Sequence, residues 1–408
     1  MTVPTQLRIA RFAANPGVHR AFHWLHLQQP QLRRWQLEML RIPAPPFGEQ
    51  ARGAWFIEHF QALGLANPHL DAAGNALAEL PGATTNTSAG NQPLILLSAH
   101  LDTVFPHTTS TEPTEVESRI LAPGACDNAA GLTGLLGLAA ALRHAEFVPA
   151  VPILFAANVG EEGEGDLRGM RHLFTQSPYA RRIAAAIALE GGGSSAVVTQ
   201  ALASRRFRIT INGPGGHAWM DAGTPNPILI LARALLALES LDLPQADPRT
   251  TLNIGQIAGG TSINSIPASA NALLDLRSTD PTQLDEFESA IRRTLAEWVP
   301  TPATLTIEII GDRPGGSLPQ DSPLLTTLRA VDRHLSLRTD PGLGSTDANI
   351  PLSLGIPAIA IGAGGLGGGI HTLQEWYDPT GRNTALRRVL LTLLDTAHLA
   401  GQSSSPVA

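Results

Sequence analysis

Four mainly apolar runs, each bounded by polar or turn-forming residues, mark the chain at residues 93–99, 151–157, 183–189 and 356–362. Continuous apolar runs of this length are typical of strands that are buried on both faces of a parallel sheet. The Ala- and Leu-rich segment at residues 131–147 has the length of a helix, so strands and helices alternate. The pattern predicts an α/β domain with a mostly parallel sheet flanked by helices.

The region before the first run has a different periodicity. Apolar residues recur at helical spacing from residue 19 to about residue 65, and the Pro-rich segment IPAPPFGEQ interrupts them. Because proline removes a backbone donor and fixes φ, we expect two helices separated by this turn.

The pattern changes again at Ser204, where polar and apolar residues begin to alternate in SRRFRITING. A helix that starts at Asn-Pro is expected at residues 226–241, and further alternating runs follow it. Alternation of this kind is typical of antiparallel strands with one buried face. We therefore predict a smaller α+β lid and dimerisation domain at residues 204–311, inserted into a catalytic domain formed by residues 1–203 and 312–408.

Length and charge narrow the possible functions. With 408 residues, the chain exceeds the size at which a single core usually stops growing, which favours two domains. Its 43% hydrophobic and 15% charged residues are an ordinary globular balance. The formal net charge is -7 and Lys and Arg form no dense block, so we expect no nucleic-acid partner.

Cys126 is the only cysteine, which excludes an internal disulfide and a zinc cage made of thiolates. A metal site would therefore use histidine and carboxylate ligands. The N-terminal segment scatters Arg and His among its apolar residues, unlike a secretory signal, and the sequence has no apolar run of about 18 residues. We expect a soluble, cytoplasmic protein with no membrane partner.

Side chains that can do chemistry gather directly after the predicted strands and in Gly-rich turns. The stretches are SAHLDTV, GACDNAAG, NVGEEGEG, ALEGGG and GGGIHTLQEW. Alone, His100 reads as a core histidine and Asp127 as a helix N-cap. Glu161, Glu162 and Glu190 read as parts of solvated turns. Together they indicate a cation site, because several ionised carboxylates at buried strand ends are costly without a positive partner.

In order and spacing, these motifs resemble those of the zinc-dependent exopeptidase/aminoacylase family. That family includes tripeptide aminopeptidase, carboxypeptidase G, acetylornithine deacetylase and succinyl-diaminopimelate desuccinylase. The marks are the His-x-Asp-Thr-Val of residues 100–104, the turn with Asp127, the Glu-Glu-Gly of residues 161–163 and the late His371. The resemblance spans nearly the whole chain. It implies a metallohydrolase that cleaves an amide bond of a small peptide, as an aminopeptidase or carboxypeptidase does, or of an N-acyl amino acid.

The resemblance also implies a centre with two zinc ions, in which Asp127 would bridge the ions. His100 and Glu190 would complete one site. Glu162 and His371 would complete the other. Imidazole and carboxylate ligands suit zinc, and a bridging carboxylate holds two ions about 3.5–4 Å apart, as hydrolytic centres require. Cobalt and manganese are the alternative metals.

Two further acids have roles beside the metal ligands. Asp102 lies two residues after His100 in the predicted strand and so faces the same side, where its carboxylate would accept the other ring N–H. Glu161 remains free of metal and suits a general base that takes a proton from the attacking water and passes it to the leaving amine.

The inserted domain adds three candidate residues. The Gly-rich turn NGPGGHAWM resembles the family's turn whose histidine, here His217, stabilises the oxyanion, usually in the partner subunit's site. Asn264 and Arg277 match lid positions that hold a substrate carboxylate, for which Arg offers a bidentate fork. Without a role in function, His217 would be an ordinary turn histidine and Arg277 would form an ordinary surface ion pair. The resemblance implies a homodimer.

Two departures from the family pattern concern the metal motifs. The common Asp-Asp is Asp127-Asn128 here, which keeps the bridging acid and removes one neighbouring charge. Glu190 is typical of the carboxypeptidase and deacylase branches, whereas the surrounding NVGEEGEGDLRGMRHLF looks like the aminopeptidase branch. The sequence therefore leaves two substrate classes, a small peptide and an N-acyl amino acid.

Other readings of the sequence compete with this one. The glycines of residues 362–367 fit G-x-G-x-x-G after an apolar run, which would favour a nucleotide-binding oxidoreductase. That fingerprint needs a helix at its end and an acidic residue on the next strand, and neither is indicated. A catalytically silent metal- or peptide-binding relative would lack a ligand or the base, and none is missing. Cys126 beside Asp127 is read as a buried packing residue.

Overall fold

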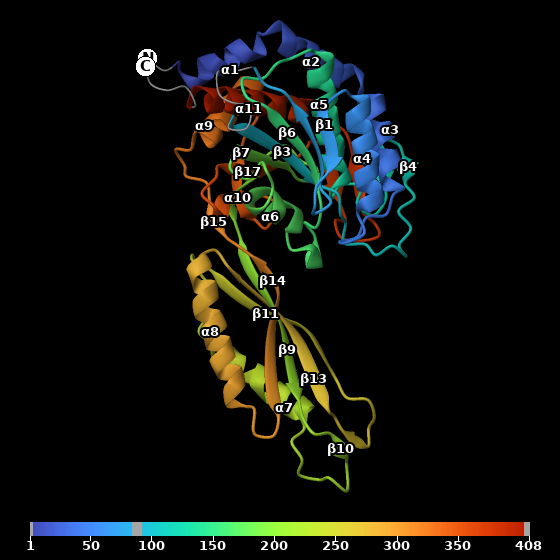
Figure 1. Cartoon of the computed structure of the whole chain (residues 1–408), viewed down its shortest axis with the longest axis vertical. Helices are drawn as coiled ribbons and strands as arrows, with labels where there is room; N and C mark the ends of the chain where they lie inside the picture. The colour runs from blue at the N-terminus through green and yellow to red at the C-terminus, as the bar shows by residue number, and fades with distance from the viewer. Residues whose placement is uncertain (1–2, 84–91, 404–408) are drawn as a thin grey trace. The chain divides into compact units, whose positions relative to one another are not determined.

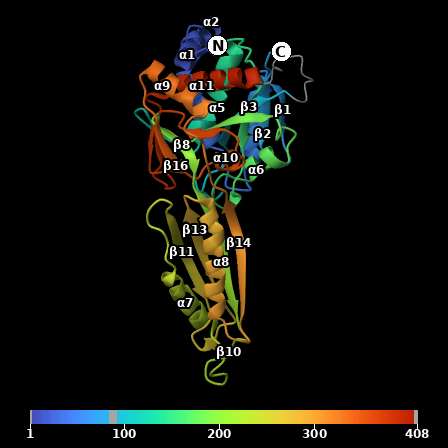
Figure 2. The ribbon, with the colours of Figure 1, turned by 90° about the vertical axis from the view of Figure 1, so that its left-hand side faces the viewer.

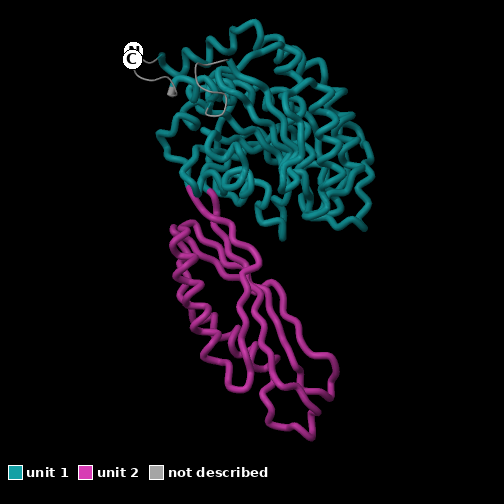
Figure 3. The backbone as a smooth tube through the Cα atoms, in the orientation of Figure 1, with its two compact units in different colours: residues 1–200, 317–408 teal, residues 201–316 magenta. Residues whose placement is uncertain are grey.

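The computed structural model describes residues 3–83 and 92–403. It divides into two compact units (Figure 3), unit 1 formed by Met1–Gln200 with Ser317–Ala408 and unit 2 by Ala201–Gly316. Unit 2 extends beyond the predicted insertion at both ends, since its first long strand begins at Ala203 and its last ends at Arg313. Among the described residues, no helix is long and apolar enough to cross a membrane.

Unit 1 is built on a nine-stranded sheet of order β1-β2-β6-β3-β7-β17-β8-β15, with β16 paired to β8. The four central strands β6, β3, β7 and β17 are parallel, and the outer pairings β1–β2, β2–β6 and β17–β8 are antiparallel. The strands are β1 Ala66–Leu70, β2 Ala76–Leu80, β3 Leu94–His100, β6 Ile153–Asn158, β7 Ile183–Leu189, β8 Ala196–Ala201, β15 Gly316–Ser317, β16 Asp340–Gly344 and β17 Ala358–Ile361.

Helices surround this sheet (Figure 1), which confirms the predicted fold class. They are α1 Thr5–Ala13, α2 Pro16–Leu27, α3 Gln29–Leu40, α4 Gln50–Ala62, α5 Ala129–His144, η1 Gly163–Gly165, α6 Arg168–Thr175, α9 Pro323–Leu335, α10 Asn349–Ser353 and α11 Arg382–Ser403. Helix α5 packs on β3, β6 and β7, and its far side meets α2 and α3. Gly137 permits this second contact, since a Cβ there would lie 2.8 Å from Leu32 Cδ2.

The prediction of two helices between residues 19 and 65 is wrong, because α2, α3 and α4 occupy this region. The first predicted helix is divided at Gln28, where α2 ends and α3 begins. Pro30 lies in the first turn of α3 and has no N–H to continue the hydrogen bonding of α2.

A second, four-stranded sheet in unit 1 brings two distant loops together. Its order is β18-β19-β5-β4, with β4 Thr114–Val116, β5 Arg119–Leu121, β18 Leu366–Gly368 and β19 Trp376–Asp378. The chain leaves β5 into the loop that carries Asp127, and the turn between β18 and β19 carries His371. Because β19 pairs with β5, the two loops start from adjacent strands.

Unit 2 has an antiparallel sheet of order β11-β13-β9-β14, with α7 and α8 packed side by side on one face (Figure 2). A short β10–β12 ladder lies beside it. The elements are β9 Ala203–Asn212, β10 Gly216–His217, α7 Pro227–Ala237, η2 Leu238–Ser240, β11 Thr250–Gly259, β12 Ser265–Ile266, β13 Ser269–Ser278, α8 Pro281–Glu297 and β14 Thr304–Arg313. Its apolar core, which includes Phe207, Leu231 and Leu295, is separate from that of unit 1.

Candidate metal centre

The parallel strands deliver three acidic or imidazole side chains to one edge of the sheet. His100 ends β3, Glu190 directly follows β7, and Glu162 lies four residues after the end of β6. The carboxyl ends of neighbouring parallel strands meet at the same edge, which is where ligands of open α/β sheets bind. The predicted buried strands therefore place these residues close together.

The first group of contacts surrounds the His100 ring, which is fully buried. Its Nε2 lies 3.1 Å from Asp127 Oδ1 and 3.2 Å from Glu190 Oε1. Asp127 precedes α5, and the side chain of the following residue, Asn128, caps that helix. Asn128 also bonds to the backbone of Leu189 and Gly191 at both sides of Glu190, so it ties the Asp127 turn to the end of β7.

The second group surrounds the His371 ring. Its Nε2 lies 3.2 Å from Asp127 Oδ2 and 2.9 Å from Glu162 Oε1. Asp127 thus faces one imidazole with each carboxylate oxygen. The structure brings together all five predicted metal ligands, in the same two groups that the motifs imply.

The electrostatics of these residues suit a cation. Ligand atoms of His100, Asp127 and Glu162 all lie within 4.8 Å of one another. Asp127 Oδ1 and Glu190 Oε2 are buried and accept no hydrogen bond, although the former lies near the His100 ring. Such oxygens normally have a partner, and a metal ion would satisfy them. The donor set is two imidazoles and three carboxylates, which fits zinc.

The pKa shifts of the two histidines reflect the negative charge of the carboxylates around them. The hydrogen bond with Asp127, with further help from Glu162, raises the pKa of His371 to about 9. Burial opposes protonation of His100, but Glu190 and the neighbouring aspartates outweigh it and raise the pKa of that ring. Burial first, and then the nearby Asp127, raise the pKa of Glu162 to about 7. A site that draws protons onto its imidazoles is also one that attracts a dication.

Asp102 has a role that differs in part from the predicted one. The His100 Nδ1 lies 3.0 Å from the backbone carbonyl oxygen of Asp102 and 3.7 Å from its carboxylate, so the hydrogen bond goes to the carbonyl. The buried carboxylate instead accepts the backbone N–H groups of Glu161 and Glu162, at 3.0 and 2.7 Å. Asp102 therefore fixes the turn that presents both glutamates. Glu161 itself is 5% exposed.

Glu375 is a functional candidate that the sequence reasoning missed. Its side chain is completely buried and accepts three backbone N–H groups, from Gly124, Cys126 and Asp127, at 2.8–2.9 Å. It lies four residues after His371 and so connects the two loops that carry the second group of contacts. The motif GGGIHTLQEW contains it, but only the observed contacts assign it to the Asp127 loop.

We expect Glu375→Gln to weaken metal binding by about 10- to 100-fold, the usual cost of losing a partner that orients a ligand. The amide NH2 would face a backbone N–H in place of a carboxylate oxygen, and the Asp127 loop would shift. Competition with a chromogenic chelator measures the affinity, and circular dichroism checks the fold. Glu112→Gln, at an exposed surface ion pair with Arg41, is the control. Equal affinities of both variants and the wild type would remove Glu375 from the centre.

The glycines of residues 362–367 serve close backbone packing. The segment leaves β17 and enters strand β18, so no helix opens at its end as a dinucleotide fingerprint requires. A Cβ at Gly362 would lie 2.5 Å from the carbonyl oxygens of Gly192 and Gly193, and one at Gly367 would lie 2.2 Å from Cys126 Sγ. This structure disfavours the oxidoreductase reading.

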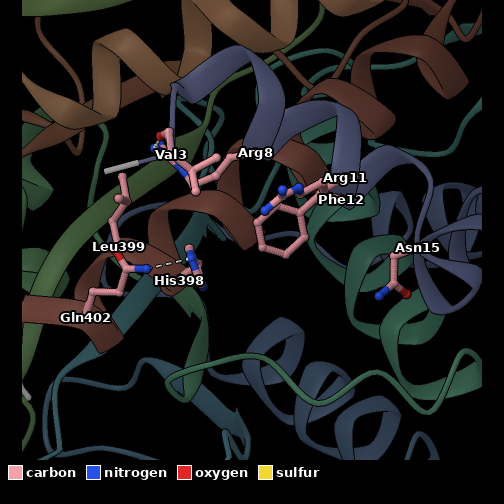
Figure 4. Close-up of a pocket in the computed structure, with 8 residues that line it drawn as sticks. All are labelled: Val3, Arg8, Arg11, Phe12, Asn15, His398, Leu399 and Gln402. Atoms are coloured by element: carbon pink, nitrogen blue, oxygen red, sulfur yellow. Dashed lines mark hydrogen bonds between the residues drawn. The ribbon is translucent and has the colours of Figure 1, made fainter. Parts of the chain in front are cut away.

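A cavity of about 290 Å³ borders the candidate centre. Asp127 and Glu190 form one side of it, and glycines of the 191–193 and 365–367 segments, with Leu366 and Ile370, form much of the rest. A larger cavity of about 520 Å³ lies between α1 and α11 (Figure 4), and it contains none of the predicted site residues. The chemistry of the centre therefore points to the smaller, Gly-lined cavity for substrate.

In unit 2, the structure brings His217 and Asn264 together. The N–H of Ala218 donates to the backbone carbonyl of Asn264 at 3.1 Å, and His217 pairs with Ser265 in the β10–β12 ladder. His217 is exposed, and its Nδ1 accepts the N–H groups of Trp219 and Met220. The ring proton therefore lies on Nε2, which leaves that nitrogen as a donor.

Arg277 is not brought to the same place. It lies near the end of β13, whereas β12 and Asn264 adjoin the start of that strand, about 26 Å away at 3.3 Å per residue. Its guanidinium makes a bidentate ion pair with Asp275, at 2.8 and 3.0 Å. Burial of Asp275 opposes its ionisation, but Arg277 and Arg206 outweigh burial and lower the pKa of this carboxyl. The arrangement matches the structural alternative, an ion pair within the strand.

Comparison with protein families gives a match over most of the chain. The model of peptidase family M20/M25/M40 matches residues 96–395. A probable carboxypeptidase of Aspergillus clavatus is 30% identical over 253 residues, which cover 56% of this chain and 54% of that protein. The chain thus spans about half the length of the curated relatives that it matches.

Solved structures share the architecture. A tripeptidase from Staphylococcus aureus superposes with a TM-score of 0.71 at 23% identity, over 90% of this chain and 98% of that one. A Bacillus subtilis protein described as a dinuclear metal binding peptidase gives a TM-score of 0.64 at 15% identity, over 90% and 98% of the two chains. At these identities the likeness establishes the fold.

Proposed function

Because the chain belongs to peptidase family M20/M25/M40, we propose that it is a two-zinc hydrolase that cleaves an amide bond of a small peptide or an N-acyl amino acid. The observation that carries this proposal is the position of Asp127, whose two carboxylate oxygens face the rings of His100 and His371. A carboxylate shared between two ligand groups is what a pair of hydrolytic metal ions requires. The Bacillus subtilis structure is described as dinuclear, which supports the same reading.

In this proposal the first ion would be held by His100, Asp127 and Glu190. The second would be held by Asp127, Glu162 and His371. When bound, zinc polarises the carbonyl of the scissile amide and lowers the pKa of water. Cobalt or manganese would bind to the same imidazole and carboxylate set.

Glu161 is the proposed general base. Its carboxylate takes a proton from the attacking water as the new C–O bond forms, and it then gives that proton to the amide nitrogen as the C–N bond breaks. Asp102 holds the backbone of Glu161 and of Glu162, so the base keeps a fixed place beside a metal ligand. The burial of Glu161 keeps bulk water from competing for the proton.

His217 is the proposed donor to the tetrahedral oxyanion. Two backbone N–H groups fix the proton on its Nε2, so the ring can donate a hydrogen bond without first being protonated. The neighbouring Asn264 offers a second polar group on the same loop pair. Since Arg277 is engaged with Asp275, we leave it out of the proposed binding set.

A second copy of the chain is the proposed partner of unit 2. Its β11 is an edge strand whose Ile254 and Ile257 are exposed, and α7 exposes Leu229 and Leu236. An edge strand with apolar side chains is a surface that proteins normally cover, and two copies of β11 could pair about a twofold axis. The family resemblance implies that His217 of one copy serves the centre of the other in such a dimer.

Complementation between two inactive variants tests this arrangement. We expect a refolded equal mixture of His217→Ala and Glu161→Gln to regain about one quarter of wild-type activity, because half of the dimers are mixed and each holds one complete site of two. Light scattering on the same samples measures the oligomeric state. A mixture that stays inactive while dimers form would place His217 in its own subunit's site.

The substrate class is tested with a panel on zinc-loaded protein. The panel contains tripeptides with free termini, the same tripeptides with the amine or the carboxylate blocked, and N-acyl amino acids. We expect hydrolysis of at least one class and its loss after treatment with a chelator. Loss of cleavage on blocking the amine would assign an aminopeptidase, and loss on blocking the carboxylate would assign a carboxypeptidase or deacylase. Full activity of metal-stripped protein would overturn the proposed function.

A further inference from the structure

Helix α2 exposes three histidines on one face. Val18, Ala21 and Leu25 form its buried side, and His19, His23 and His26 are exposed on the opposite side. The helix is well defined, since Pro16 occupies its first turn and the Asn15 side chain caps its N-terminus. The three histidines are therefore held at fixed spacing on a rigid element.

The spacing brings each pair of neighbouring rings within reach of one shared ion. His19 and His23 are four residues apart and His23 and His26 three apart, the two separations that place helical side chains about 5–6 Å from each other. Two histidines at four-residue spacing on one helix face form a known zinc-binding pair. His19 and His26 lie about 10 Å apart along the axis, so His23 is common to both usable pairs.

The rings are available for a metal. The imidazole ring of none of the three histidines makes a hydrogen bond, an ion pair or a ring contact with any residue that the structure describes. The one cation within their span, Arg20, directs its guanidinium to the backbone carbonyl of Ala145 at 2.9 Å. The ring nitrogens thus face solvent, and that arginine is engaged elsewhere.

We propose that this face of α2 binds one divalent transition-metal ion through His23 together with His19 or His26. The site shares no residue with the candidate centre at Asp127, and it does not depend on the proposed function. Imidazole ligands select copper, nickel and zinc over calcium or magnesium. With two protein ligands, the remaining coordination positions belong to water.

Nickel titration of untagged protein tests the site. The protein is first loaded with zinc and freed of excess metal, so that the Asp127 centre does not compete, and Ni²⁺ binding is then measured by calorimetry. We expect His23→Ala to weaken binding by more than about tenfold, because it removes the ligand common to both pairs. His19→Ala and His26→Ala each leave one pair and should weaken binding less.

A matched control is His334→Ala, an exposed histidine in the last turn of α9 with no histidine three or four residues away. This variant should bind Ni²⁺ like the wild type. Unchanged binding by His23→Ala, or an equal loss in His334→Ala, would overturn the proposal. Thermal unfolding without added nickel should be the same for all variants, since the substituted side chains are exposed. Nickel should raise the unfolding temperature of the wild type more than that of His23→Ala.

Discussion

Glu161→Gln is expected to lower kcat by about 10²- to 10⁴-fold, the range that a positioned general base contributes. Glutamine has the same size and can still accept a hydrogen bond, but it cannot take a proton from water at neutral pH. The backbone bonds from residues 161 and 162 to Asp102 remain, so the proposed metal ligand Glu162 should keep its place. Steady-state kinetics combined with the zinc content per subunit measures both effects.

Two further variants test whether the loss of kcat is specific to Glu161. Glu164→Gln changes an exposed glutamate three residues further along and should leave kcat and zinc content at wild-type values. Glu162→Gln changes the neighbouring buried glutamate that contacts His371, and it should lose zinc as well as activity. Retention of wild-type kcat by Glu161→Gln would show that another group moves the proton.

The sequence predicted most of unit 1, because its strands have a clear apolar pattern. The strands β3, β6, β7 and β17 consist mainly of buried apolar residues, which is characteristic of strands covered on both faces. A charged residue at the end of such a strand therefore stands out in the sequence. The family expected from the motifs is confirmed, since its model matches residues 96–395.

What the sequence did not predict depends on contacts between distant segments. Glu375 bonds to backbone groups of the Asp127 loop, almost 250 residues earlier, and periodicity contains no sign of such a bond. The division between α2 and α3 depends on a single proline inside a region that otherwise keeps helical spacing. The ion pair of Arg277 with Asp275, two residues away on the same strand face, is likewise a contact that the resemblance does not indicate.

Asp127→Asn is expected to lower kcat/KM by more than about 10³-fold, or about 4 kcal/mol of transition-state stabilisation. The two oxygens of Asp127 face different imidazoles, at 3.1 and 3.2 Å. Asparagine keeps the shape but presents an NH2 group to one of them and lacks the negative charge. Both ions should therefore bind more weakly, and metal analysis should find less than one zinc per subunit.

A stability measurement separates this loss of metal from a loss of fold. Zinc at one hundred times its dissociation constant should stabilise the wild type by about 2.7 kcal/mol for each ion bound, because it binds only the folded state. The Asp127→Asn protein should show almost none of this stabilisation, while its unfolding temperature in chelator stays close to that of chelated wild type. Asp340→Asn, an exposed residue at the start of β16, should respond to zinc like the wild type. A normal zinc response in Asp127→Asn would mean that this carboxylate does not join the two ions.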